Sequence, residues 1–328
     1  MNKVKAWFLL FRPWSYTATL IPFAVAAGLL GVLGLADGDC HWGHWTLGLV
    51  AGILFQATVN LLNTWGDERS GVDSAPGAIC TTPQIREGLV SMRALLLVAL
   101  GCAFAASVLG VSLCFYRAPE WQLNVPLLIA GFIGLLGSTN YSTGIKFKYH
   151  GLGVPFVSFL MGPLEIFVAF SLLEPDFARE MLMPDPAMPL ILLMAILLTL
   201  PIASLVGVIM HGNDMRDIPS DRAAGIVTLA SWLGPRKALG YYRICHLLPY
   251  GVTCLNILLF GNVLNNGIWA YTWAWLPFLC LPLTVKTLRT AVKTYRECPE
   301  SPKWRGLERA SGGIHLVYGL LYALALYL

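Results

Sequence analysis

Long apolar stretches, separated by short polar segments, recur along the whole chain of 328 residues. Apolar runs near or above about 18 residues are typical of transmembrane helices and exceed what a soluble core helix needs. We predict nine such helices, at residues 13–35, 45–65, 94–115, 124–141, 153–173, 188–211, 238–260, 268–290 and 310–328. The pattern therefore predicts an all-α fold, a polytopic membrane bundle that forms one integral-membrane domain over residues 1–328.

The composition agrees with a bilayer environment, because 56% of the residues are hydrophobic and only 12% are charged. Soluble domains typically have about twice that charged fraction. With the N-terminus in the cytoplasm, nine helices place 20 of the 22 Lys and Arg residues on the cytoplasmic side, leaving only Arg117 and Arg179 opposite. This asymmetry follows the positive-inside rule. The basic residues form no aromatic-interleaved face, so we predict no nucleic-acid partner.

Two polar clusters begin where long apolar stretches end, and the predicted topology puts both at the cytoplasmic face. Their oxygen-bearing members are Asn63, Asp67 and Asp73 in the first, and Asn213, Asp217 and Asp221 in the second. In both clusters an Asn is followed four residues later by an Asp, which stacks the two side chains on one helical face. Charged groups at membrane depth are costly and usually mark a functional site.

Each cluster contains one residue that breaks the helical pattern. Asp73 lies six residues beyond Asp67 and needs a bend, which Gly71 can supply because glycine tolerates unusual backbone angles. Pro219 removes a backbone hydrogen bond if it lies inside a helix. We therefore consider that one helix ends near Asp217 and that another starts at Pro219.

The clusters also suggest an internal repeat, since each follows the second helix of a four-helix set. The predicted bundle then contains two four-helix pseudo-repeats, helices 1–4 and 5–8, plus a ninth helix. Internal repeats often place a site at the interface between the halves. The longest predicted cytoplasmic connections, 66–93, 212–237 and 291–309, are expected to form cap loops, and two of them contain the clusters.

Carboxylate and amide oxygens suit Mg²⁺, which usually takes one or two carboxylates together with phosphate oxygens. Two facing acidic walls could hold Mg²⁺ ions that bridge a diphosphate and stabilise its departure. Arg216 and Arg222 flank the second cluster, and the 141–153 loop adds Lys146 and Lys148. The alternative is that the clusters are ordinary juxtamembrane charged loops and that these lysines are topology signals. Glu165, within an apolar stretch, is expected to have an interior partner of structural or functional importance.

These residues resemble the UbiA superfamily of intramembrane prenyltransferases over nearly the whole chain. The similarity rests on the Arg12–Thr19 segment, the two clusters, the segment from Tyr141 through Gly153, the Gly162-Pro163-Leu164 triplet and the segment from Asn213 through Ala230. Within the superfamily, the N-x-x-x-D-x-x-x-G-x-D pattern from Asn63 to Asp73 is similar to the 1,4-dihydroxy-2-naphthoate prenyltransferase branch, which makes menaquinone precursors.

The resemblance implies that a polyprenyl diphosphate loses its diphosphate and that the resulting allylic cation alkylates an aromatic quinone precursor. It implies Mg²⁺ ligands at Asn63, Asp67, Asp73, Asn213, Asp217 and Asp221, with the four aspartates catalytic. It implies diphosphate contacts at Arg216, Arg222, Lys146, Lys148 and Tyr141. It also implies a bacterial or archaeal inner membrane as the location.

Two positions depart from the superfamily pattern. Thr64 and Val154 stand where relatives often have acidic residues, so the acceptor could differ from the naphthoate. A hydroxybenzoate, a porphyrin-like ring and a lipid alcohol stay open as acceptors, as does a catalytically inactive lipid-binding scaffold. A cation-binding transporter is a further alternative, although coupling sites usually lie near the midplane and these acids gather at one face.

Overall fold

The computed structural model describes residues 2–36, 38–71, 83–116, 124–174, 177, 186, 188–263, 273–298, 304 and 306–328. Within these ranges the chain is helical, and its single β-type contact is an isolated parallel bridge between His150 and Val227. The all-α prediction is therefore confirmed for the described residues.

The first half of the chain contains both long helices and short turns, in the order α1 (Lys3–Phe11), η1 (Pro13–Ser15), α2 (Thr17–Val32), α3 (Trp42–Ser70), α4 (Pro83–Arg86), α5 (Met92–Tyr116), α6 (Val125–Asn140) and η3 (Phe147–Tyr149). The second half follows as α7 (Gly153–Phe159), a π-helical turn η4 (Leu160–Leu164), α8 (Glu165–Leu173), α10 (Met188–Ala223), α11 (Leu229–Val263), η5 (Trp273–Cys280), α13 (Leu281–Glu297) and α14 (Leu307–Tyr327). Gly234 kinks α11 with φ of 73°, a backbone conformation that favours glycine.

Helices overlap all nine predicted segments, but fewer than nine of the described helices are long and apolar enough to cross a membrane. Six described segments are long and apolar enough to span a bilayer: Lys3–Val32, Trp42–Arg69, Met92–Phe115, Gly153–Leu173, Pro189–Ala223 and Leu307–Tyr327. A shorter apolar helix covers Val125–Asn140. These helices make the chain an integral membrane protein. The nine membrane crossings and the two four-helix repeats stay predictions.

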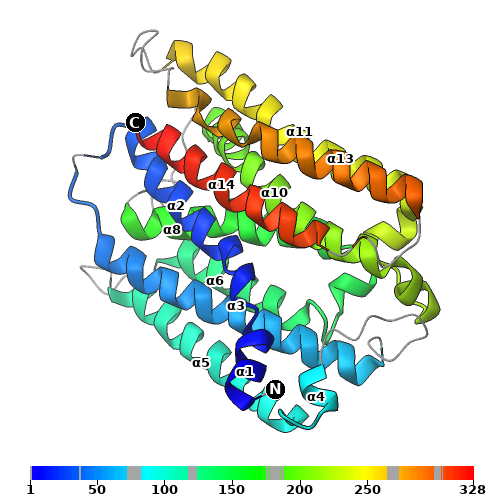
Figure 1. Ribbon diagram of the computed structural model, residues 1–328. Coiled ribbons are helices and arrows are strands. Elements are labelled where there is room, and N and C mark those ends of the chain that lie inside the picture. The colour runs from blue at the N-terminus through cyan, green and yellow to red at the C-terminus, as the bar shows by residue number, and fades with distance from the viewer. Residues whose placement is uncertain are drawn as a thin grey trace.

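The long helices pack side by side as one bundle (Figure 1). Helix α2 contacts α3, α8 and α14, while α10 contacts α11, α14 and α7, and α5 contacts α3 and α6. The C-terminal ends of α3 and α10 lie toward the same end of this bundle, on the right in Figure 1. The two acidic clusters occupy these ends, so the fold brings them toward each other.

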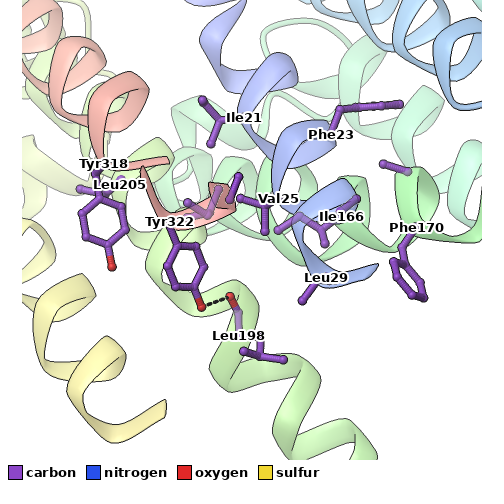
Figure 2. Packing of buried hydrophobic residues seen from close by; sticks show 14 of the residues in the cluster. Ile21, Phe23, Val25, Leu29, Ile166, Phe170, Leu198, Leu205, Tyr318 and Tyr322 are labelled. Carbon is purple, nitrogen blue, oxygen red and sulfur yellow. Dashed lines mark hydrogen bonds between the residues drawn. The ribbon is translucent and has the colours of Figure 1, made fainter. Parts of the chain in front are cut away.

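The largest hydrophobic core lies where α2, α8, α10 and α14 meet. Figure 2 shows Val25 of α2 beside Ile166 of α8, with Tyr322 of α14 facing α10. The Tyr322 hydroxyl donates a hydrogen bond of 2.9 Å to the backbone oxygen of Leu198. A buried tyrosine normally needs such a partner for its polar end. This core fixes the relative positions of the helices below the acidic clusters.

The N-terminal helix α1 was not predicted, because nine residues are too few to give a clear apolar stretch. Its Ala6 and Leu10 are buried against α3 and α5. The chain turns after α1 at Arg12, whose φ is 51°, and the Arg12 guanidinium donates a 3.2 Å hydrogen bond to Thr64. Thr64 therefore serves as an anchor for the N-terminal segment.

Candidate active site

Helix α3 presents Asn63 and Asp67, one turn apart, to the interior of the bundle. Their exposed fractions are 9% and 8%, as the predicted spacing on one face requires. The helix ends at Ser70, and Gly71 follows with φ of 73°. This left-handed cap is the bend that was predicted there. Asp73 lies outside the described residues, so its predicted ligand role stays a prediction.

The 141–153 loop supplies the partners of Asp67. The Lys148 Nζ lies 2.9 and 3.2 Å from the two Asp67 carboxylate oxygens and 3.5 Å from the Asn63 Oδ1. The Tyr149 hydroxyl donates a 2.6 Å hydrogen bond to Asp67 Oδ1. The same loop is tied to the α10–α11 connection, because the Val227 N–H donates to the Tyr149 backbone oxygen at 3.3 Å. The predicted residue Lys148 is therefore part of the site, and Tyr149 is a member that the sequence did not single out.

Tyr141 and Ser142 form the inner part of this loop. Ser142 donates a hydrogen bond to Asn63 Oδ1, and the backbone N–H of Lys148 donates to the Tyr141 oxygen at 3.1 Å. Tyr141 is only 4% exposed, and burial together with nearby Asp214 raises the pKa of its hydroxyl well above the ordinary value. Tyr141 is therefore a neutral hydrogen-bonding group. Lys146 lies beside the ring of Tyr149, with Nζ 5.5 Å from the ring centroid.

Helix α10 provides the second acidic wall, and it runs unbroken from Met188 to Ala223 with Pro219 inside it. The expected break near Asp217 is thus wrong. Buried Met215 and Ile218, next to the proline, pack in a cluster with α11. This packing holds the helix together despite the lost backbone bond.

Asp214 and Asp221 are the buried carboxylates of α10, with exposed fractions of 5% and 3%. The Thr228 hydroxyl donates a 3.0 Å hydrogen bond to Asp221. Asp214 interacts electrostatically with Asp221, Asp217 and Lys148, so it belongs to the site although the Asn-to-Asp spacing did not select it. Its position three residues before Asp217 was the only signal available, and many exposed helical acids share that spacing.

The other predicted residues of α10 have different environments. Arg216 makes a two-pronged contact with its neighbour Asp217, at 2.7 and 2.6 Å, and lies 3.7 Å from Glu308 of α14. Arg222 is exposed, with its guanidinium 3.8 Å from the place that a Cβ on Gly234 would occupy. Asn213 is partly buried. Their roles in binding Mg²⁺ and diphosphate stay predictions.

The two walls meet around Lys148. This lysine interacts with Asp67, Asp214 and Asp221, and Asp221 also interacts with Asp67. Among the described residues, the site therefore gathers four carboxyl groups, those of Asp67, Asp214, Asp217 and Asp221, around two partly buried cations, Lys148 and Arg216. Because these carboxyl groups outnumber the cations, their ionised forms would repel a diphosphate.

The donor set fits Mg²⁺ shared with a substrate. Among the described residues, no three His, Cys, Asp or Glu side chains are close enough together to enclose a metal ion. Mg²⁺ commonly binds one or two carboxylates and completes its coordination with water and phosphate oxygens. The carboxylates lie on two separate helices, α3 and α10. Each helix can therefore supply one or two ligands to a Mg²⁺ ion that is also bound by substrate phosphate.

Two further predicted positions lie deeper in the bundle. Val154 is 1% exposed and packs toward Gly207 of α10. Glu165 begins α8 after the π-helical turn, and its Oε1 is 3.2 Å from the place that a Cβ on Gly52 would occupy. Glu165 therefore lies beside α2 and α3 in the interior of the bundle, where a partner for it was expected.

Comparison with known proteins places these features in a family. The UbiA prenyltransferase family matches residues 9–305. Human UbiA prenyltransferase domain-containing protein 1 is 28% identical over 330 residues, covering 100% of this chain and 85% of the human protein. The protein of the same name from Ailuropoda melanoleuca is 32% identical over 252 residues, covering 76% of this chain and 67% of that protein.

Solved structures show the same fold. The structure of a UbiA homolog from Archaeoglobus fulgidus bound to GPP and Mg²⁺ has a TM-score of 0.59 at 16% identity, covering 98% of this chain and 99% of that chain. A structure described as digeranylgeranylglyceryl phosphate synthase has a TM-score of 0.53 at 15% identity, covering 100% of this chain and 99% of that chain.

The comparisons also bear on the predicted location. The two relatives described above are animal proteins, which gives no support to the expected bacterial or archaeal membrane. The cytoplasmic orientation of the site stays a prediction from loop charge. The match over residues 9–305 and the shared fold together show that this chain belongs to the UbiA prenyltransferase family.

Proposed function

We propose that this protein transfers a polyprenyl group from an allylic diphosphate to an aromatic quinone precursor, 1,4-dihydroxy-2-naphthoate. The observation that supports the proposal best is the pair of acidic walls on α3 and α10 with Lys148 between them. A pocket with more carboxylates than cations binds a diphosphate only when divalent cations neutralise the repulsion.

The residues of the chain have separate tasks in this proposal. Asp67, Asp217 and Asp221 would hold Mg²⁺ together with Asp214 and Asn63. The bound Mg²⁺ supplies Lewis acidity that favours departure of the diphosphate. Lys148 is 2.9 Å from Asp67 and would turn toward the diphosphate oxygens if a metal ion took its place beside that carboxylate.

Tyr149 and Ser142 keep Asp67 and Asn63 oriented, since each donates a hydrogen bond to a proposed ligand oxygen. Pre-oriented ligands need little rearrangement as charge develops on the leaving diphosphate. Arg216 is a further candidate for the diphosphate, although its pair with Asp217 must loosen before it can make that contact.

The naphthoate acceptor rests on the pattern from Asn63 to Asp73 and on family membership. A hydroxybenzoate, a porphyrin-like ring and a lipid alcohol are the alternatives within the same reaction class. Val154 is apolar and packed against α10, so it offers no charged contact to an acceptor. The acceptor must therefore be identified by experiment with several candidates.

The decisive assay uses the full-length protein in lipid nanodiscs with geranylgeranyl diphosphate and Mg²⁺. The naphthoate and 4-hydroxybenzoate are offered in separate reactions, and mass spectrometry detects prenylated products, with EDTA as the metal control. We expect an Mg²⁺-dependent prenylated naphthoate. A product from 4-hydroxybenzoate alone would refute the naphthoate assignment, and no Mg²⁺-dependent release of pyrophosphate with either acceptor would refute prenyl transfer to both of these acceptors.

A matched pair of variants tests the metal assignment. Asp67→Asn should abolish turnover without unfolding the protein. Glu68→Gln removes the neighbouring carboxylate, which lies 3.8 Å from Arg86, and should leave turnover near normal. Near-normal pyrophosphate release by Asp67→Asn would rule out Asp67 as a ligand.

A further inference from the structure

A groove on the outer surface of the bundle lies far along the chain from both acidic walls. It has a volume of about 670 Å³ and is formed by η5 and α13. Figure 1 shows α13 in orange at the edge of the bundle, beside α11. The lining residues are of two kinds, apolar at one end and basic at the other: Phe278, Leu281, Pro282, Val285, Lys286, Arg289, Thr290 and Lys293.

The two kinds of residue are separated along the axis of α13. The apolar residues come first, and the cations Lys286, Arg289 and Lys293 follow at spacings of three and four residues, which puts them on one helical face. From Val285 to Lys293 the helix rises by roughly 12 Å. The groove is therefore elongated, with an apolar end and a cationic end.

The surroundings of the apolar end are those of a helix in contact with hydrocarbon. Leu279 is 69% exposed and Trp275 is 48% exposed next to the groove. Tryptophan is enriched at membrane interfaces, and large exposed apolar side chains on an integral membrane protein face lipid. An occupant of this groove must therefore enter from the bilayer and have an apolar part.

The cationic end selects a negatively charged headgroup. Lys286, Arg289 and Lys293 are all exposed, and Thr290 adds a hydroxyl between them. Among the described residues, Lys293 forms an ion pair with Glu297 at 3.8 Å, and both side chains are mostly exposed. Such exposed pairs contribute little, so a phosphate can displace this one.

We propose that this groove binds an anionic phospholipid, with its phosphate against Lys286, Arg289 and Lys293 and an acyl chain along Val285, Leu281 and Phe278. Clusters of Lys and Arg beside a membrane helix attract anionic headgroups. The two ends of the groove lie at the depths that the headgroup and the acyl chain of a lipid occupy. The cations lie toward the 291–309 connection, which the distribution of loop charge places at the cytoplasmic surface, and the apolar residues lie deeper in the bilayer. The site does not depend on the proposed reaction.

The test is native mass spectrometry of the delipidated, full-length protein titrated with phosphatidylglycerol or phosphatidylcholine of the same acyl chains. We expect phosphatidylglycerol to bind at least about tenfold more tightly than phosphatidylcholine. Replacing Lys286, Arg289 and Lys293 together by Gln should weaken phosphatidylglycerol about 100-fold, because each cation near an anionic headgroup contributes about fivefold. Val285→Trp, which fills the groove without changing charge, should weaken both lipids.

The matched control replaces three exposed cations of α11, Arg236, Lys237 and Arg243, by Gln. It removes the same charge from another helix and should leave phosphatidylglycerol binding within about twofold of the wild type. An equal loss in the control variant would show general electrostatic attraction and overturn the proposal. Thermal unfolding in phosphatidylcholine nanodiscs verifies that every variant is folded.

Two further results would also overturn the proposal. If inorganic phosphate alone displaced phosphatidylglycerol at comparable concentration, the groove would be a phosphate site and not a lipid site. If the groove variants lowered the number of chains per particle at constant lipid content, the occupant would be a second copy of the chain. We expect neither displacement by phosphate nor a change in mass.

Discussion

Replacing Lys148 by Gln should destabilise the substrate-free protein, because it leaves Asp67 as a buried charge without its cation. Burial alone would lower the pKa of Lys148, but the carboxylate of Asp67 raises it above its ordinary value, so the lysine is charged at neutral pH. The side chains of the pair are 15% and 11% exposed, and their charged atoms are 2.9 Å apart. At an effective dielectric constant of about 20, this separation corresponds to roughly 6 kcal/mol of attraction before desolvation.

The net effect is smaller, because both charges lost hydration when they were buried. Breaking one side of a buried pair typically costs about 3–5 kcal/mol. Asp67 retains the 2.6 Å hydrogen bond from Tyr149, so we expect a loss near the lower end, about 3 kcal/mol. For a chain of 328 residues that corresponds to a melting temperature lower by roughly 4 °C.

The assay is thermal unfolding in nanodiscs without divalent metal, with Lys146→Gln as the control. Lys146 lies in the same loop but contacts the ring of Tyr149, so its replacement should have a small effect. Combining Lys148→Gln with Asp67→Asn should recover much of the loss, because the unpaired charge is then gone. Added Mg²⁺ should stabilise Lys148→Gln more than the wild type, since no lysine competes for Asp67. Equal melting temperatures for the two lysine variants, or an absence of coupling in the double mutant, would refute the reasoning.

Three other predictions concern hydrogen bonding, helix packing and ligand binding. Tyr149→Phe removes the hydrogen bond to Asp67 and should lower stability by about 2 kcal/mol, measured by the same unfolding assay; no change would show that the bond adds nothing. Gly28→Ala should lower stability by about 1–3 kcal/mol, because its Cβ would lie 2.3 Å from the Ala323 backbone oxygen of α14, whereas Gly110→Ala, with no atom within 4 Å, should not. Geranylgeranyl diphosphate should raise the melting temperature only with Mg²⁺; an equal rise in EDTA would contradict the repulsion expected from four carboxylates.

The sequence was most informative where a regularity along the chain determines the structure. Apolar length predicted the helical segments, and the spacing of Asn63 and Asp67 predicted their common face. Gly71 was predicted as a bend because its role depends on local backbone geometry. These features depend on residues within a few positions of one another, and a single sequence displays them directly.

The features that were missed depend on contacts between distant segments. Tyr149 reaches Asp67 across 82 positions, and no local pattern distinguishes it from an interfacial aromatic residue. Asp214 becomes buried only because α10 continues past it into the site. A helix was expected to end near Asp217 and another to begin at Pro219, since local propensity contains no information about the packing of Met215 and Ile218 against α11. Tertiary packing outweighed propensity at that position.

The arrangement of the two walls explains why the 141–153 loop matters more than its length suggests. Lys148 of the loop pairs with Asp67 of α3, and Tyr149 orients the same carboxylate. The backbone hydrogen bond between Val227 and Tyr149 fastens the loop to the α10–α11 connection. A movement of this loop therefore changes the charge balance of both walls at once. Since Val154 directly after the loop is packed against α10 and is apolar, the loop governs the diphosphate end of the site while offering the acceptor no charge at that position. Substitutions in the loop should thus affect use of the diphosphate for every acceptor alike, and acceptor preference must be determined by other residues of the bundle.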